Sequence, residues 1–243
     1  EMAIRKAGRK KTDIRYLFSG DLLGQLIATS FGTGSLEIPL FGLYGACSTM
    51  GEAMSLGAMT VHGGYADRVL AMASSHFATA EKEFRFPLAY GSQRPFSATW
   101  TVTGCGAVVI EKAVQGNDKV KIRGLTTGRV IDLGVRDSMN MGAAMAPAAA
   151  DTICQNLKDF GRRPEDYDHI ITGDLGSVGR EILIDLLKKE GYDISEMHLD
   201  CGMLIYESKA QGTGAGGSGC GCSAVTLAGH FLKQVEQGKL QRI

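Results

Sequence analysis

Cys47 is the strongest candidate for a reactive side chain in this sequence, because it follows Gly45-Ala46 directly before an apolar stretch that predicts a helix. The first turn of a helix presents unbonded N–H groups and the positive end of the helix dipole. Both stabilise a thiolate, so a cysteine at this position can be acidic and nucleophilic. The alternative that the spacing leaves open is a small buried thiol without reactivity.

His76 is a second candidate, because it follows the apolar run that begins at Val69. Ligand sites in open α/β folds gather where strands end. His76 is therefore a candidate ligand residue, and a histidine satisfied within its own turn is the alternative. Glu81–Phe86 is expected to be a solvated loop or helix face. Arg85 and Arg94 are expected to be loop cations that could meet an anion.

Two further patterns are weak. Gly212–Gly217 fits Gly-x-Gly-x-x-Gly, but Glu207–Gln211 separates it from the strand-like Met203–Tyr206. A dinucleotide site needs the motif directly between a strand and a helix, so we expect a tight turn into a buried helix instead. His198-Leu199-Asp200-Cys201 lacks further ligands at a recognised zinc spacing, and we predict no metal site.

The elements that would position these residues alternate between strand-like and helical stretches, which favours an α/β fold with mainly parallel pairing. Two predicted helices, residues 50–61 and 223–232, carry almost no charge and are expected to be buried on all sides. They favour a central helical layer between two sheets. The strand-like runs are Ile14–Leu22, Val69–His76, Gly106–Ile110, Lys119–Gly124 and Tyr167–Leu175.

An internal repeat divides the sequence. Three pairs of segments recur in the same order once one insertion is allowed, which indicates a duplication: Ile14–Leu22 with Tyr167–Leu175, Gly45–Ser48 with Cys220–Ser223, and Gly64–Val69 with Gly238–Ile243. Gly8–Lys10 and Gly161–Arg163 match at the same offset as the first pair. We expect a first half at 1–114 and a second at 115–243. The partner of the run at 119–124 would precede residue 1, and the last strands of the second half are absent. The natural protein is therefore expected to be longer at both ends.

Charge and composition exclude several classes of protein. The chain has 26 basic and 26 acidic residues, so it lacks the basic excess of nucleic-acid binders and of polybasic membrane-surface binders. Hydrophobic residues make up 44%, too many for a disordered chain. Six cysteines without a Cys-x-x-Cys pair favour reduced thiols. No apolar run is long enough to span a bilayer.

Three segments stand in the order and spacing of the first half of the thiolase superfamily, which the chain resembles: Ala46-Cys47-Ser48, Gly64–Val69 and Thr103–Val109. That superfamily includes thiolases and ketoacyl-carrier-protein synthases. The resemblance implies a thiolase-like, layered αβαβα fold of two duplicated halves with central buried helices. It also implies a homodimer.

A closer resemblance, along essentially the whole chain, is to the stage V sporulation protein AD (SpoVAD) family of endospore-forming bacteria. The segments that carry it are Gly20–Leu23, Gly45–Thr49, Ser74–His76, Ala78–Glu81, Met145–Thr152, Thr172–Leu175 and Gly216–Cys220. It implies a sporulation protein that binds dipicolinic acid (pyridine-2,6-dicarboxylate) and helps to move it into the developing spore with other SpoVA proteins. It places the protein on the cytoplasmic side of, or peripheral to, the spore inner membrane.

The chain departs from the condensing enzymes of the superfamily at two positions. Those enzymes carry a histidine after a strand of the second half, and a histidine or asparagine before its buried helix. The first region here reads Thr172–Leu175, with Asp174, and the second contains Ser218. An aspartate repels a developing oxyanion instead of stabilising it. The resemblance therefore implies a converted binding pocket rather than an enzyme.

The candidate ligand-binding residues are then Cys47, Ser48, Ser75, His76, Asp174 and Ser218. One carboxylate of the ligand would meet the helix N-terminus, with Ser48 and Thr49 as hydroxyl donors, and His76 would meet the other. Asp174 beside a dianion needs a proton or a bridging Ca²⁺, so calcium could enter with the ligand; no other cofactor is expected. Two alternatives stay open: acyl transfer by Cys47, and a structural role in a membrane-associated complex.

Overall fold

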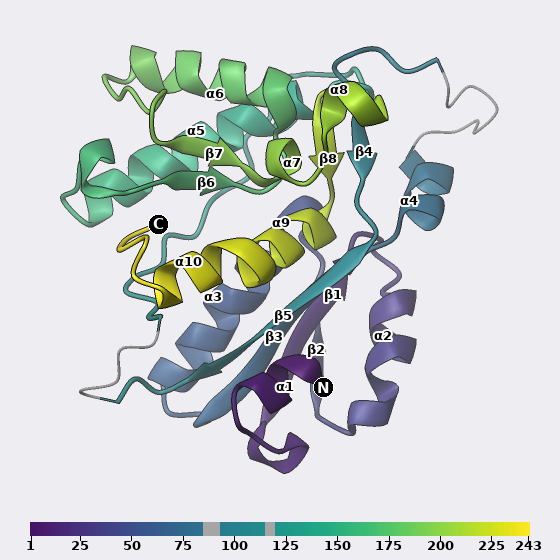
Figure 1. The fold of residues 1–243 in the computed structure, drawn as a ribbon, viewed down its shortest axis with the longest axis vertical. Helices are drawn as coiled ribbons and strands as arrows, with labels where there is room; N and C mark the ends of the chain where they lie inside the picture. The colour runs from purple at the N-terminus through teal and green to yellow at the C-terminus, as the bar shows by residue number, and fades with distance from the viewer. Residues whose placement is uncertain (85–92, 115–119) are drawn as a thin grey trace. The chain divides into compact units, whose positions relative to one another are not determined.

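The computed structural model describes residues 1–84, 93–114 and 120–243 (Figure 1). The chain divides into two compact units. Unit 1 consists of Glu1–His76, Val102–Ile122 and Gly219–Glu236, and unit 2 consists of Phe77–Thr101, Arg123–Ser218 and Gln237–Ile243.

Unit 1 is built on a four-stranded sheet in the order β2-β1-β3-β5. The strands are β1 (Tyr16–Asp21), β2 (Leu40–Gly42), β3 (Arg68–Ser75) and β5 (Gly104–Glu111). β1 pairs in parallel with β2 and β3, whereas β3 and β5 are antiparallel. The predicted runs at 14–22, 69–76 and 106–110 are therefore confirmed as strands.

Side chains on the two faces of this sheet enter two different cores, because successive residues of a strand point to opposite faces. One face packs against α3 (Thr49–His62), with Phe18, Val69 and Ala71 in that core. The other core contains Leu17 and Leu70 together with Ile4 of α1. The remaining helical segments before β2 are α1 (Met2–Lys6), α2 (Ile27–Thr33) and the 3-10 turns Lys11–Asp13 and Gly34–Leu36.

α9 (Cys220–Thr226) contacts β3, β5 and α3. It begins before the predicted start at residue 223, and a π-turn at Leu227–Phe231 joins it to α10 (Leu232–Glu236). Its backbone lies directly on β5: a Cβ added to Gly106 would overlap the carbonyl group of Ala224. Only glycine permits so close an approach.

The expectation that both apolar helices are buried on all sides is wrong. In residues 223–232, Ala224 and Phe231 are buried, but Gly229 and His230 are exposed. In α3, Met50 and Ala53 are buried, but Met59 is 49% exposed near the end of the helix. Small residues make α3 apolar, but neighbouring elements do not cover every side of the helix.

Unit 2 contains two pairs of parallel strands, β4 (Thr99–Thr101) with β8 (Gly216–Ser218) and β6 (Ile170–Thr172) with β7 (His198–Asp200). α5 (Met141–Asp159) and α6 (Gly176–Lys189) pack together through a core that includes Ala146, Leu183 and Leu187. The smaller helical segments are α4 (Phe77–Phe84), the 3-10 turn Pro164–Asp166, α7 (Cys201–Leu204) and α8 (Ser208–Gln211).

Two sequence-based predictions in unit 2 and at its boundary are wrong. Residues 120–124 form no strand, although their apolar and polar residues alternate; Lys119 lies outside the described residues. Met203–Tyr206, which looked strand-like, contains the end of α7. A strand requires a hydrogen-bonded neighbour as well as a suitable pattern, and local sequence does not reveal that neighbour.

The same turn precedes β1 in unit 1 and β6 in unit 2. Arg9 N–H donates to Ile4 carbonyl after α1, and Arg162 N–H donates to Leu157 carbonyl after α5. The 3-10 turns that follow are capped alike: Lys10 N–H donates to Asp13 Oδ2 and Arg163 N–H donates to Asp166 Oδ2, each at 2.8 Å. These matched turns occur where the sequence repeat placed Gly8–Lys10 and Gly161–Arg163.

Within the described ranges, no helix combines the length and the apolar character that crossing a membrane requires.

Replacing Gly106 with alanine should destabilise unit 1, because the new methyl group would push α9 away from β5; overpacking typically costs about 1–3 kcal/mol. Gly51, an exposed residue of α3 with no atom within 4 Å of an added Cβ, is the matched control. Gly51→Ala should be neutral or stabilising by up to about 1 kcal/mol. Urea denaturation of the two variants checks this, and equal midpoints would refute the close-packing explanation.

Candidate functional site

Cys47 lies in a 3-10 turn, Ala46–Ser48, that leads directly into α3. This confirms the predicted position at the start of the first apolar helix. The thiol residue is half-buried, and its turn contacts α9. Ala46 has a φ of 47°, in the left-handed region that non-glycine residues rarely adopt. Backbone strain of this kind tends to occur at functional sites.

Hydroxyl groups hold this turn in place. Thr49 donates from Oγ1 to the Ala46 carbonyl at 2.8 Å and accepts from Gly45 N–H at 3.2 Å. Ser48 donates to the Gly45 carbonyl at 2.8 Å. Thr49 is fully buried, and in this structure its hydroxyl holds the turn. Ser48 is exposed and its hydroxyl lies at the surface of the turn.

The carboxyl ends of the parallel strands β1, β2 and β3 lie at one edge of the sheet of unit 1. His76 directly follows β3 and is exposed, and the Cys47 turn follows β2. Cys47 and His76 therefore follow the carboxyl ends of β2 and β3, which lie on either side of β1 in unit 1. Parallel-strand ends of this kind are where α/β folds place ligands.

Asp21, the last residue of β1, also lies at this edge. Its Oδ1 accepts from Leu23 N–H at 3.1 Å, and its Oδ2 accepts from both the N–H and the hydroxyl of Thr29 at 2.9 Å. The carboxylate is 4% exposed. These hydrogen bonds stabilise the negative charge of Asp21. Because the donors belong to Leu23 and Thr29, they also hold the loop between β1 and α2 in place.

Ser75 fixes the start of α9. Its hydroxyl donates to the Val102 carbonyl at 2.5 Å and accepts from Gly221 N–H at 3.1 Å. Ser75 is 6% exposed. Because Gly221 is in the first turn of α9, Ser75 satisfies one of the N–H groups that a helix leaves unbonded. The hydroxyl therefore serves packing in this structure.

Unit 2 contains the other two candidates, Asp174 and Ser218, which are 5% and 7% exposed. Asp174 lies in the turn between β6 and α6, and Ser218 ends β8. Asp200 organises that turn: it accepts from the Thr172 hydroxyl at 2.6 Å and from the N–H groups of Leu175 and Gly176 at 2.9 and 3.0 Å. Burial raises the pKa of Asp200, against the lowering effect of these hydrogen bonds.

His198 is buried behind the same turn. Its Nε2 lies 2.9 Å from Thr172 Oγ1. Since Thr172 donates to Asp200, Nε2 of His198 must donate to Thr172, and Nδ1 has no hydrogen-bond partner among the residues that the structure describes. Burial lowers the pKa of His198 to about 4, with a smaller contribution from Arg180. His198 and Asp200 thus belong to a hydrogen-bond chain, and the described residues contain no metal-binding cluster.

The expectation that residues 81–86 form a solvated face is wrong for Glu81. Its side chain is 1% exposed and pairs with Arg94, which is 8% exposed. Arg94 is therefore engaged by a carboxylate of its own chain, whereas Arg85 lies outside the described residues. The sequence offered no signal for a pair separated by this many residues.

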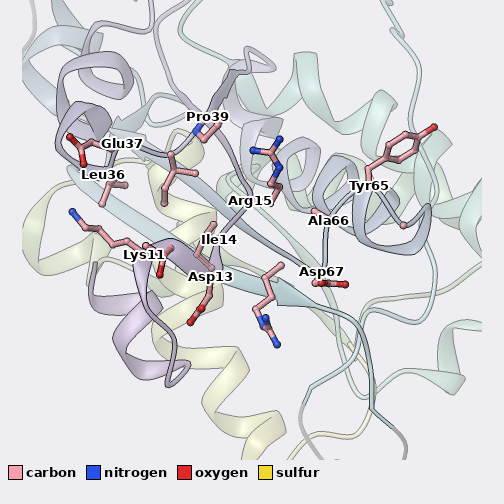
Figure 2. A pocket seen from close by; sticks show the side chains of 14 residues that line it. Lys11, Asp13, Ile14, Arg15, Leu36, Glu37, Pro39, Tyr65, Ala66 and Asp67 are labelled. Atoms are coloured by element: carbon pink, nitrogen blue, oxygen red, sulfur yellow. The ribbon is translucent and has the colours of Figure 1, made fainter.

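A pocket of about 640 Å³ opens at the amino ends of β1 and β3, opposite the edge that carries Cys47 (Figure 2). Arg15 and Tyr65 are among the side chains around it. Its charged residues balance in sign: Lys11, Arg15 and Arg68 against Asp13, Glu37 and Asp67. This pocket offers no positive excess to a dianion, and no motif in the sequence points to it.

Comparison with protein families matches residues 1–243 to the Stage V sporulation protein AD (SpoVAD) model. Stage V sporulation protein AD of Bacillus subtilis (strain 168) is 49% identical over 242 residues, covering 100% of this chain and 70% of the relative. The chain belongs to the Stage V sporulation protein AD family.

Solved structures show which fold the family shares. 3-oxoacyl-[acyl-carrier-protein] synthase III from Aquifex aeolicus VF5 matches with a TM-score of 0.64 and 15% identity, over 98% of this chain and 73% of the enzyme. OleA from Xanthomonas campestris matches with a TM-score of 0.70 and 15% identity, over 98% and 69% of the two chains. The chain therefore has a mixed α/β fold that resembles these thiolase-like condensing enzymes.

The buried His198 should make stability depend on pH. In the unfolded chain its pKa is near ~6.5, against about 4 in the folded protein. Between these values the unfolded chain binds a proton that the folded protein excludes, so stability falls as pH decreases from 6.5 to 4, by up to roughly 3 kcal/mol from this group. Urea titrations across this range measure the loss.

His198→Gln should make the decline with pH shallower, whereas His62→Gln, at an exposed position at the end of α3, should leave the decline unchanged. Identical slopes for the wild-type protein and His198→Gln would show that the buried ring does not control acid stability.

Proposed function

We propose that this chain is a non-catalytic binding protein for dipicolinic acid, alone or as its calcium chelate, and that it takes part in uptake of this compound into the developing spore. The observation that carries the proposal is the edge of unit 1 where the Cys47 turn follows β2 and the exposed His76 follows β3, two strands that run in parallel on either side of β1. A helix N-terminus and an imidazole are two groups that suit the two carboxylates of a rigid ligand.

Cys47 and Ser48 would receive the first carboxylate at the start of α3. Ser48 is exposed and its hydroxyl donates to the Gly45 carbonyl at the surface of the turn, so it can turn toward a ligand. His76 would meet the second carboxylate, more strongly when protonated. The nearby Asp21 weakens this site little, because its oxygens already accept three hydrogen bonds. Ser75 would support the site through α9.

Asp174 and Ser218 remain proposed ligand residues contributed by unit 2. A calcium ion carried by the dipicolinate would supply the positive charge that a buried carboxylate such as Asp174 needs beside an anion. The chelate is therefore the ligand form that best accommodates this residue.

Acyl transfer by Cys47 is the second candidate. The strained φ of Ala46 directly before Cys47 favours it, as does the fold shared with condensing enzymes. In that reaction the Cys47 thiolate would attack the carbonyl of an acyl-CoA, and the CoA thiolate would leave and take up a proton. Asp174 and Ser218 stand where the condensing enzymes carry histidine or asparagine, so the groups that stabilise an oxyanion there are lacking and binding is the better-supported function.

The matched turns before β1 and β6 support two duplicated halves, 1–114 and 115–243. We also infer a homodimer, formed by antiparallel pairing of β2 with β2 of a second copy. β2 is the edge strand of its sheet, and Leu40 and Phe41 are 38% and 50% exposed on it. An apolar, unpaired edge strand is a ready template for another strand. We further propose that the protein acts with other SpoVA proteins, peripheral to the spore inner membrane or on its cytoplasmic side; membership of the family supports this.

Calorimetric titration of the full-length protein with dipicolinate, with and without calcium, tests the binding function. Cys47→Ala should weaken the affinity about tenfold, equivalent to ~1.4 kcal/mol, because the ligand lies against that turn. Cys105→Ala, at an exposed cysteine on β5, is the matched control and should bind like the wild type.

Affinity for dipicolinate no greater than for benzoate would overturn the binding proposal. A mass increase at Cys47 after incubation with acyl-CoA, absent in Cys47→Ala, would instead establish acyl transfer.

The dimer is tested by sedimentation at micromolar concentration. Phe41→Lys should yield a monomer, because it places like charges opposite each other across the pairing axis, whereas Tyr65→Lys, on the α3–β3 loop, should not change the mass. A monomeric wild-type protein would exclude β2 pairing.

A further inference from the structure

Five side chains at the ends of the segment 77–101 form a connected group in unit 2, called here the Trp100 cluster: Phe77, Glu81, Arg94, Trp100 and Thr101. At its centre, Arg94 Nη2 lies 2.5 Å from Glu81 Oε2, and these two side chains are 8% and 1% exposed. An ion pair this deeply buried is uncommon, because both charges lose their hydration.

Aromatic rings complete the environment of the arginine. The guanidinium carbon of Arg94 lies 4.0 Å from the centre of the Trp100 ring, within cation–π range. Phe77 stacks on Trp100, with ring centres 5.5 Å apart and an interplanar angle of 13°. Arg94 is therefore fixed by a carboxylate and by a flat ring, a combination that suits a planar guanidinium and not the ammonium group of lysine.

Glu81 connects the pair to β4. Its Oε1 accepts from the N–H of Thr101 at 3.3 Å and from the Thr101 hydroxyl at 3.1 Å. Thr101 is the last residue of β4, and in the parallel ladder with β8 it stands opposite Ser218. A continuous set of contacts thus leads from Arg94 through Glu81 and Thr101 to the strand that ends in Ser218.

The β4–β8 ladder needs such support. Each strand has only three residues, and a two-stranded ladder is at best marginally stable alone. β8 contains two glycines, Gly216 and Gly217, which contribute no side-chain packing. Outside the ladder, Ala215 N–H donates to the Ala98 carbonyl at 3.0 Å. Glu81 holds the other end of the ladder through its hydrogen bonds with Thr101.

Stability alone does not account for a buried ion pair, because apolar side chains of similar volume often serve a fold equally well. An ion pair has directional hydrogen bonds that apolar side chains lack. We propose that Glu81 and Arg94 are positioning residues: they fix β4, and through it β8, so that Ser218 is held in the orientation used for ligand binding. This inference rests on the proposed role of Ser218 in binding dipicolinate.

The test compares the full-length protein with Glu81→Leu/Arg94→Met, which replaces both charges with apolar side chains. Arg129→Met/Asp151→Leu removes a solvent-accessible ion pair of the same unit and is the matched control. Three properties are measured: the urea midpoint, amide hydrogen exchange in β8, and affinity for dipicolinate by calorimetry.

The apolar pair should keep the urea midpoint of the wild type. Amides of Gly216–Ser218 should exchange at least tenfold faster, whereas those of His198–Asp200 in the β6–β7 ladder should be unchanged. Affinity for dipicolinate should fall at least tenfold. The control should change none of these properties. A merely structural pair would lower the midpoint and leave affinity intact in the folded protein.

Trp100 gives a spectroscopic check, since it is the only tryptophan in the chain. Its emission should shift when Arg94 is replaced by methionine, and should not shift in the control. If the apolar pair fails to fold, Glu81→Asp takes its place: the shorter side chain keeps its charge but cannot reach both Arg94 and Thr101. It should likewise accelerate exchange in β8 and weaken binding.

The possible results separate the two proposals. Unchanged exchange in β8 would overturn the positioning role, and so would faster exchange with full affinity. If the wild-type protein fails to bind dipicolinate, the proposed function fails. Faster exchange confined to β8 in the apolar variant would then still support control of that strand by the ion pair. Unchanged exchange in β8 would in that case reject both the binding function and the positioning role.

Discussion

Close backbone contact between α9 and the sheet is the constraint on which unit 1 depends. Gly106 allows the helix to lie directly against β5, and the Ser75 hydroxyl ties the first turn of α9 to the end of β3. Because α9 also contacts the turn that contains Cys47, one packing arrangement determines both the strand end before His76 and the position of the thiol. The chain contains 33 glycines among 243 residues. At Gly106, glycine allows α9 to lie close to the sheet beside the polar groups that this packing positions.

Local sequence predicted the parts of this arrangement that depend on local chemistry. The apolar runs located β1, β3 and β5, and the position of Cys47 before α3 followed from a glycine-containing turn and an uncharged helix. Contacts between distant residues could not be found in this way. Asp200, which holds the turn at Asp174, and Glu81, which looked solvent-exposed, take their roles from partners more than ten residues away. Residues 120–124 illustrate the reverse case, since a strand pattern without a neighbouring strand remains irregular.

Condensing enzymes share the fold of this chain, but a shared fold does not determine which reaction or ligand a site serves. At about 15% identity, the shared architecture establishes how the chain is built and leaves its chemistry open. The proposed binding chemistry rests on a half-buried thiol at a helix start, an exposed imidazole at a strand end, and an aspartate and a serine in the second unit. Ser75, Thr49 and Asp21 hold the backbone through their hydrogen bonds.

The π-turn at Leu227–Phe231 has a consequence for how the family can vary in length. A turn closed by i→i+5 hydrogen bonds contains one residue more than an α-helical turn covering the same distance. Loss of a single residue there would restore a regular helix while Cys220–Thr226 and Leu232–Glu236 kept their present faces toward their neighbours. Relatives that differ by one residue in this helix can therefore be aligned with a gap at the π-turn, and α9 stays in place on its glycines.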